Sequence, residues 1–95
     1  SNSTWTLSGL LRPDEVGEAT GIFLPEDEDS ETIAGLIADQ LERLPKLRDS
    51  VKLPVVNREG KKLLAELKVK RMDGHRVDKV QMSIHEYPVD EEELA

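Results

Sequence analysis

The second half of the chain holds three segments in which apolar and polar residues alternate, separated by short turn sequences. The first covers residues 50–56, and the turn NREG at residues 57–60 leads into the second. In that second segment Leu63, Ala65, Leu67 and Val69 share one face, and Lys62, Glu66, Lys68 and Lys70 share the other. Period-two alternation predicts a strand with one buried and one wet face, and turns this short join antiparallel neighbours. The sequence therefore predicts a three-stranded antiparallel meander.

Turn residues, a change of phase and a proline predict where the meander turns and where its strand pairing is irregular. MDGH at residues 72–75 predicts a tight hairpin, because Asp-Gly suits the backbone of two-residue turns. Val77 lies out of phase with the apolar residues that follow it, which predicts a bulge near Asp78. Pro54 lacks an N–H donor, so the first strand is expected at an edge of the sheet or at a bulge. The inner face of the third strand is expected to hold Val80, Met82 and Ile84.

The clearest helix signal lies before this meander. Ser30 or Thr32 is expected to cap the helix, because a hydroxyl oxygen accepts hydrogen bonds from the free N–H groups at a helix start. Pro45 is expected to end it, since proline cannot continue the hydrogen-bond ladder. Five apolar residues recur at helical spacing and predict one buried stripe: Ile33, Leu36, Ile37, Leu41 and Leu44.

Two shorter elements come first in the chain. TWTL at residues 4–7 predicts a strand with Trp5 and Leu7 facing inward. A short helix is expected to begin at Pro13, where proline suits the first helical position, and to stop at Gly21. The order strand, helix, helix and meander predicts an α+β fold: an antiparallel sheet of about four strands with two helices on one face.

Composition limits both the core and the chemistry. A chain of 95 residues supports one domain, and with three aromatic residues (Trp5, Phe23 and Tyr87) its core must be aliphatic. The absence of cysteine excludes disulfides, thiolate metal sites and cysteine nucleophiles, and it fits a reducing compartment. No apolar run reaches the roughly 18 residues that a membrane helix needs, so no direct membrane insertion is expected.

Charge is divided along the chain. Formal charge sums to −9 over residues 1–42, to +7 over residues 43–79 and to −5 over residues 80–95. Blocks of one sign produce a polarised surface if the fold keeps them apart, or they cancel if the fold interleaves them. The sequence leaves both outcomes open. A polarised surface would suit docking of a neighbouring domain.

The acidic loop PEDEDS has one feature of a calcium site. Asp27, Asp29 and Glu31 alternate like the first ligands of a calcium loop. An EF-hand also requires glycine at its sixth position and glutamate at its twelfth, where this chain has Thr32 and Ala38. We therefore interpret the loop as a solvated helix start and assign no metal ligand. A small-ligand or divalent-cation sensor is retained as the alternative function.

No residue pattern predicts catalysis or cofactor binding. His75 and His85 are expected at a turn and at a strand end, without a nucleophile motif beside them. Lys62, Lys68 and Lys70 form a basic strand face, but it lacks the aromatic platforms of single-strand binders, so no nucleic-acid partner is expected. The sequence assigns no catalytic residue, no cofactor-binding residue and no cofactor.

Four segments, in this order and spacing, resemble the transporter-associated domain, also called the CorC/HlyC domain. They are WTLSG (5–9), GIFLPEDEDSETIAGLI (21–37), LPKLRDSV (44–51) and MDGHRVDKVQM (72–82). The family usually has glycine where this chain has Glu42 and Arg48. Either these two residues adopt left-handed backbone geometry at some strain, or the helix continues and the following turn is rebuilt.

The resemblance implies a fold like the small subdomain of certain flavin-binding domains, without flavin binding itself, for which the chain shows no motif. It also implies a non-enzymatic accessory domain at the cytoplasmic C-terminus of multi-pass, CBS-containing hemolysin-like or magnesium/cobalt efflux proteins in the plasma membrane. The partners so implied are the membrane and CBS domains of the parent chain. An exposed sheet edge can also pair with the same edge of a second copy, which predicts a homodimer. We divide the chain into a cloning scar or linker (1–4), the domain (5–86) and an acidic tail (87–95).

Overall fold

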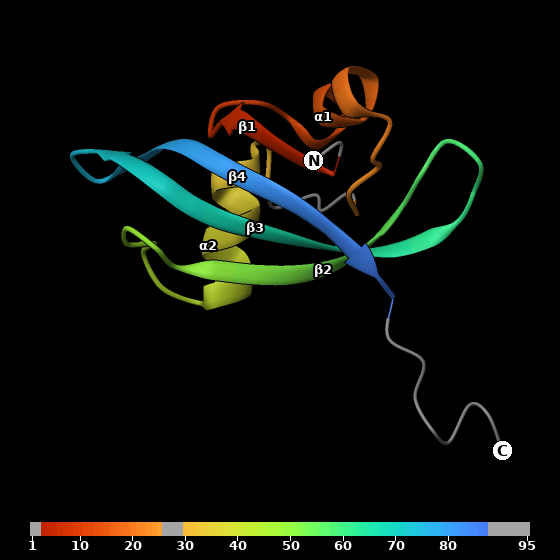
Figure 1. Cartoon of the computed structure of the whole chain (residues 1–95). Coiled ribbons are helices and arrows are strands. Elements are labelled where there is room, and N and C mark those ends of the chain that lie inside the picture. The colour runs from red at the N-terminus through yellow and green to blue at the C-terminus, as the bar shows by residue number, and fades with distance from the viewer. Residues whose placement is uncertain (1–2, 26–29, 88–95) are drawn as a thin grey trace, which may run out of the picture.

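The computed structural model describes residues 3–25 and 30–87, which form one antiparallel sheet and two helices (Figure 1). The strands lie in the order β1-β4-β3-β2. This arrangement confirms the predicted α+β fold of four strands and two helices. The bounds of the strands and helices are β1 (Thr4–Ser8), α1 (Pro13–Thr20), α2 (Ile33–Leu41), β2 (Ser50–Val56), β3 (Lys62–Asp73) and β4 (Arg76–Glu86).

The predicted meander is confirmed as β2, β3 and β4, and β1 extends it by pairing with β4. One row of side chains crosses the whole sheet, because Val51 lies opposite Leu67, Leu67 opposite Met82, and Met82 opposite Trp5. Leu67 and Met82 in this row are completely buried. The inward face predicted for β3 is therefore the face that packs on the core.

A bulge interrupts the β3–β4 pairing where the sequence predicts one. Val69 pairs with Val80, but Met72 pairs with Val77, so the register skips both Asp78 and Lys70. The irregularity lets Val77 and Val80 both point into the core, where 5% and 0% of their surfaces are exposed. The prediction near Asp78 is confirmed, and the structure adds Lys70 as the irregular residue of the partner strand.

The β3–β4 turn is one residue later than predicted. Asp73 still pairs with Arg76, which leaves Gly74 and His75 as its two central residues. Gly74 supplies the positive φ, at 62°, that such a turn requires. The expected Asp-Gly centre is wrong because the register of the rest of the hairpin continues to Asp73 and Arg76, since the irregularity skips one residue on each strand.

Close packing joins β1 to β4 beyond the end of the paired strand. The Gly9 N–H donates to the Asp78 carbonyl at 2.9 Å. A Cβ atom on Gly9 would lie 2.1 Å from the Val77 carbonyl oxygen, far inside contact distance. Only glycine fits here because two backbones meet without room for a side chain.

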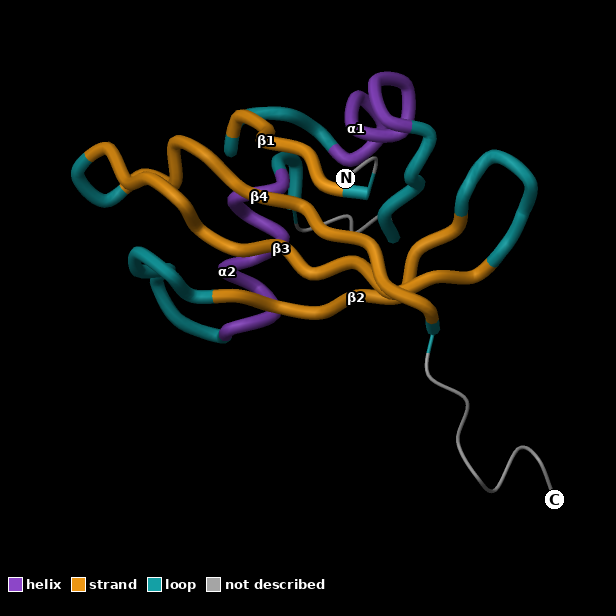
Figure 2. The backbone as a smooth tube through the Cα atoms, viewed as in Figure 1, coloured by secondary structure: helices purple, strands orange, loops and turns teal. Residues whose placement is uncertain are grey.

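Both helices begin where the sequence predicts. Helix α1 starts at Pro13 and is capped after Thr20 by Gly21, whose φ of 80° is left-handed. Helix α2 is capped by Thr32, whose hydroxyl oxygen accepts from the Gly35 N–H at 3.1 Å. Ser30, the other candidate cap, instead donates its hydroxyl to Asp39 at 2.6 Å. In Figure 2, α2 crosses the sheet on one face, and α1 lies beyond β1.

Helix α2 ends earlier than Pro45. Its last helical residue is Leu41, and Glu42 follows in left-handed geometry at φ 58°. The Glu42 N–H donates to the Ala38 carbonyl at 2.8 Å and completes this cap. The prediction that the helix reaches Pro45 is wrong because the left-handed conformation of Glu42 ends the helix three residues before the proline. Leu44 consequently leaves the apolar stripe and is 71% exposed.

Strand β2 lies at an edge of the sheet, as Pro54 predicts. Val56 exchanges two backbone hydrogen bonds with Phe23 on its free side, at 2.8 and 3.3 Å. Since backbone direction alternates along a strand, Pro54 faces the same free side and offers no N–H there. This edge is therefore poorly suited to pairing with another strand, and the homodimer stays an untested prediction.

A single aliphatic core lies between the sheet and the helices. Val16 brings α1 into the same cluster as the buried residues of α2 and the strands. The described helices include none that is long and apolar enough to cross a membrane. The completely buried large side chains are Ile33, Leu36, Ile37, Leu67, Met82, Val16, Val55, Val69 and Val80.

Candidate functional site

The segment between α2 and β2, residues 42–49, has an unusual backbone and is called here the α2–β2 loop. Glu42 near its start and Arg48 near its end both have positive φ, at 58° and 74°. Non-glycine residues adopt this conformation at a cost of about 1–2 kcal/mol. Of the two alternatives left open by the sequence, left-handed geometry at both residues is confirmed.

Asp49 holds this loop together. Its carboxylate accepts two hydrogen bonds from the Arg43 guanidinium, at 2.8 and 3.0 Å, and a third from the Lys46 N–H at 2.8 Å. These bonds stabilise the charged carboxylate, with Arg43 the largest cause, and lower the pKa of Asp49 from 3.8 to about 2. An ionised Asp49 therefore stabilises the loop conformation.

Backbone hydrogen bonds fasten the end of the loop to the sheet. The Arg48 N–H donates to the Val69 carbonyl at 2.9 Å, and the Val69 N–H donates to the Asp49 carbonyl at 2.8 Å. Because Val69 itself is completely buried, the loop is anchored to a core residue of β3.

The loop nevertheless exposes hydrophobic side chains. Leu44 is 71% exposed and Leu47 is 53% exposed, whereas Pro45 between them is buried. Helical spacing predicts a buried Leu44, but the early end of α2 turns this side chain toward solvent. Exposed leucines on a well-anchored loop are a candidate contact surface.

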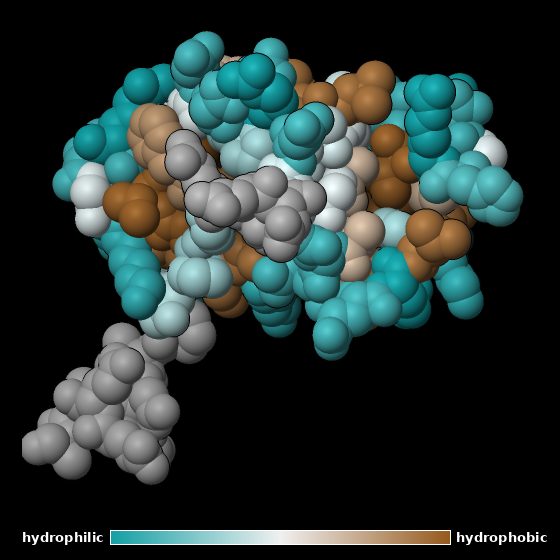
Figure 3. Space-filling model, turned by 180° about the vertical axis from the view of Figure 1, so that it is seen from behind, coloured by the Kyte–Doolittle hydropathy of each residue, from teal (hydrophilic) through white to brown (hydrophobic). Residues whose placement is uncertain are grey.

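An apolar hollow of about 290 Å³ lies on one side of the loop, between α2 and the β3–β4 turn, and is called the apolar hollow. Leu44 and Pro45 form its loop wall, and Leu10, itself 64% exposed, contributes from the chain after β1. His75 and Arg76 line the hollow from the turn. Figure 3 shows hydrophobic patches among hydrophilic residues at this end of the molecule, on the right of that view.

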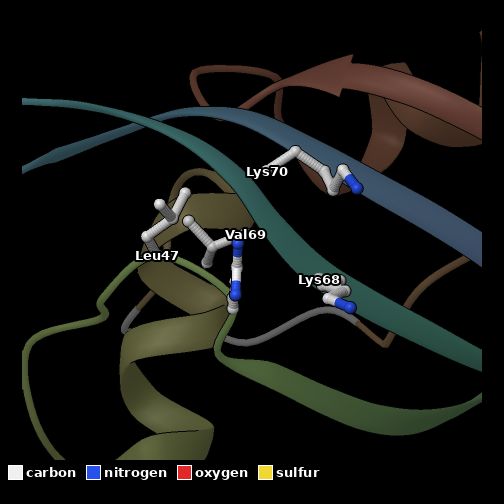
Figure 4. A pocket seen from close by; sticks show the side chains of 5 residues that line it. Leu47, Lys68, Val69 and Lys70 are labelled. Atoms are coloured by element: carbon white, nitrogen blue, oxygen red, sulfur yellow. The ribbon is translucent and has the colours of Figure 1, made fainter.

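A second hollow of about 210 Å³, the basic hollow, lies on the other side of the loop (Figure 4). The loop contributes Leu47 and Arg48, and β3 contributes Lys68, Val69 and Lys70. The two lysines belong to the basic strand face that the sequence predicts. Arg48 is not predicted as a member of this site, because only the loop backbone brings that residue to β3.

The third lysine of the predicted basic face lies apart from this hollow. Lys62 is at the opposite end of β3, where its Nζ atom lies 4.3 Å from the centre of the Tyr87 ring. A cation over an aromatic face is stabilised by the ring quadrupole. The structure therefore brings together Lys68 and Lys70 but not Lys62.

The charge blocks mostly pair within themselves. Among residues 3–25 and 30–87, four ion pairs occur, and only Lys61–Glu86, at 3.4 Å, joins two blocks. The other three are Arg12–Asp14, Arg43–Asp49 and Arg71–Asp78. Long-range neutralisation between the blocks is therefore limited in the described part of the chain.

Neither histidine belongs to an assembled metal site in the described part of the chain. His75 lies in the β3–β4 turn and His85 near the end of β4, as predicted, and both are exposed. The described residues contain no group of three or more histidine, aspartate or glutamate side chains placed to hold a metal ion. Asp27 and Asp29 lie outside the described residues, so the divalent-cation alternative stays an untested prediction.

Comparison with known proteins adds a family match. The model of the transporter associated domain, CorC_HlyC, matches residues 1–86. The UPF0053 protein MT1890 of Mycobacterium tuberculosis is 39% identical over 83 residues, which is 82% of this chain and 18% of the relative. The chain thus spans less than a fifth of the length of this curated relative.

Solved structures agree with the family match. The CorC_HlyC domain of a Corynebacterium glutamicum protein described as a hemolysin has a TM-score of 0.75 and 27% identity, covering 88% of this chain and 93% of that one. A Neisseria meningitidis region, described as associated with the Mg²⁺ and Co²⁺ transporter CorC, has a TM-score of 0.67. It is 20% identical and covers 87% of this chain and 90% of its own, so it supports the fold alone.

Proposed function

Because the chain belongs to the CorC_HlyC transporter-associated domain family, we propose that it modulates ion transport as an accessory domain of a hemolysin-like or magnesium/cobalt efflux protein. The family is one of accessory domains and not a known enzyme class. The observation that carries the proposal is the family match over residues 1–86. In this proposal the domain catalyses no reaction and lies at the cytoplasmic face of the plasma membrane, next to the membrane and CBS domains of its parent.

The length comparison supports a role within a larger protein. The matched segment is 18% of the Mycobacterium tuberculosis relative, so in that protein most of the chain lies outside this domain. A domain in that position can act by contact with the rest of its chain, and inter-domain contacts typically use modest, partly polar surfaces.

We assign this contact to the α2–β2 loop and the apolar hollow. Leu10 and Leu44 line this hollow and expose most of their surface. Large exposed apolar side chains that lie close together often mark a surface that contacts another domain. Arg43 and Asp49 hold the loop that presents Leu44. In the proposal, apolar side chains of the neighbouring parent domain fill the hollow.

Ion flux by the parent protein, measured with and without this domain in reconstituted vesicles, tests the function. Deletion of residues 1–95 is expected to change the flux or its dependence on ion concentration. The double variant Leu10→Ser/Leu44→Ser should change flux in the same direction, because it removes two exposed apolar side chains of the apolar hollow and leaves the core intact.

The matched control is Val56→Thr, which alters another exposed aliphatic residue, at the end of β2 that lies away from the loop. This variant should leave flux unchanged. Unchanged flux on domain deletion, across the full range of ion concentrations, would contradict the proposed function. An effect of deletion without an effect of the leucine variant would contradict the assigned contact surface.

A further inference from the structure

The basic hollow gathers three positive side chains that have no partner among the residues described. Arg48, Lys68 and Lys70 line it, and in the described part of the chain none of their side chains joins an ion pair or donates a hydrogen bond. Arg43 on the same loop and Arg71 on the same strand are both paired with aspartates. Within residues 3–25 and 30–87, therefore, no ion pair neutralises the positive charge at this hollow, unlike that of Arg43 and Arg71.

Backbone irregularities place two of these three residues. Arg48 has a left-handed φ of 74°, yet its N–H is bonded to Val69, so this costly conformation is held in place. Lys70 is the residue that the β3–β4 register skips, and bulges of this kind redirect a side chain. Strained and irregular positions that the surrounding structure maintains are typical of binding sites.

Figure 4 shows how the hollow is arranged. Lys68 and Lys70 come from one strand, and Leu47 lies on the other side of Val69. One side of the hollow can thus contact negative oxygen atoms, and Leu47 can contact carbon atoms. Its volume of about 210 Å³ is below the roughly 300–1,000 Å³ of sites that enclose a whole drug-sized ligand.

We propose that the basic hollow binds the phosphate or diphosphate group of an anionic ligand whose remaining part lies outside against Leu47. Three cations match the charge of such a group, and arginine and lysine together are the common ligands of phosphate oxygens. The same chemistry is offered by a soluble phosphorylated small molecule and by a phospholipid headgroup. The site is separate from the apolar hollow to which we assign the contact with the parent protein.

Titration of the 95-residue chain with inorganic pyrophosphate at constant ionic strength, followed by amide chemical shifts, tests the proposal. Saturable shifts are expected around Arg48 and Val69. Lys68→Gln and Lys70→Gln should each weaken binding about tenfold, the effect of losing one charge-assisted hydrogen bond. The matched control Lys52→Gln removes the same charge from an exposed position on β2 outside the hollow and should leave the affinity unchanged.

Arg48→Gly separates binding from folding, because it removes a cation and also relieves the left-handed strain. It should weaken pyrophosphate binding while raising the melting temperature. Glu42→Gly relieves similar strain without removing a cation, and it should raise the melting temperature with no loss of binding. If Arg48→Gly binds pyrophosphate as tightly as the original chain does, the proposal is wrong.

Co-sedimentation with phosphatidylcholine vesicles, with and without phosphatidic acid, distinguishes the two ligand sources. Binding only to vesicles that contain phosphatidic acid, lost in Lys68→Gln, identifies a lipid headgroup. Pyrophosphate binding without vesicle binding identifies a soluble ligand. The absence of both, or equal weakening by Lys52→Gln, would overturn the site. None of these outcomes depends on ion flux, so the proposed function is tested independently.

Discussion

The inner face of the sheet and the α2–β2 loop differ in how they hold aliphatic side chains. On the sheet, Leu67 and Met82 are completely buried and face each other across β3 and β4. In the loop, Leu44 and Leu47 are mostly exposed, and hydrogen bonds to Asp49 hold the backbone that carries them. Stability and presentation of apolar surface therefore reside in different regions and should be separable by mutation.

The largest expected effect is in the sheet. Leu67→Ala should lower the free energy of unfolding by about 2–5 kcal/mol, because it leaves a cavity in a closely packed core. Leu44→Ala should change it by no more than about 0.5 kcal/mol, as is usual for an exposed side chain. Urea denaturation of both variants measures the difference, and equal losses would contradict the distinction between the two regions.

A smaller loss is expected where β1 leaves the sheet. Gly9→Ala should destabilise the chain by about 1–3 kcal/mol, because the new methyl group would overlap the Val77 carbonyl and force backbone atoms apart. Gly60→Ala is the matched control, since a Cβ there has no neighbour within 4 Å and only its φ of 82° opposes the change. Thermal unfolding should rank Gly9→Ala as the more harmful, and the reverse order would disprove the backbone contact.

In the loop a substitution should stabilise the chain. Arg48→Gly is expected to gain up to about 1 kcal/mol, because glycine adopts positive φ without the Cβ clash but loses more entropy on folding. Glu42→Gly should gain a similar amount at the other end of the loop. Urea midpoints measure both, and a loss of stability in both would show that their side chains make compensating contacts.

The smallest effect is a dependence on pH. Asp49 has its pKa lowered to about 2 in the folded chain, so its contribution to stability is complete above its ordinary pKa of 3.8 and disappears as the pH falls toward 2. Asp49→Asn removes this contribution. The melting temperatures of the original chain and the variant should differ most above about pH 4 and converge on acidification. A constant difference across that range would refute the ionic origin of the loop's stability.

The family resemblance and the fold were predictable from short segments of the chain. Three predictions rest on local features and are confirmed: the buried face of β3 from its alternation, the cap of α2 from the Thr32 hydroxyl, and the edge position of β2 from Pro54. The division of the chain at residues 1–4, 5–86 and 87–95 stays a prediction, as do the partners and the location at the membrane.

The candidate site was predictable only in part. Lys68 and Lys70 appear on one strand face in the sequence, because neighbouring positions of the same face are two residues apart. Arg48 could not be assigned to them, since its distance from β3 is set by pairing between segments far apart in the chain. The one available signal was that Arg48 occupies a position where the resembled family usually has glycine.

The sequence by itself determined which segments form strands and helices, because side-chain alternation, helical spacing and capping are local properties of the chain. Tertiary structure decided where α2 ends and what surrounds the α2–β2 loop. Left-handed geometry at Glu42 ends α2 and turns Leu44 outward, and the bonds of Arg48 and Asp49 to Val69 anchor the other end of the loop to β3. Both hollows follow from this loop geometry, since each is formed by the loop against elements that meet it only after folding.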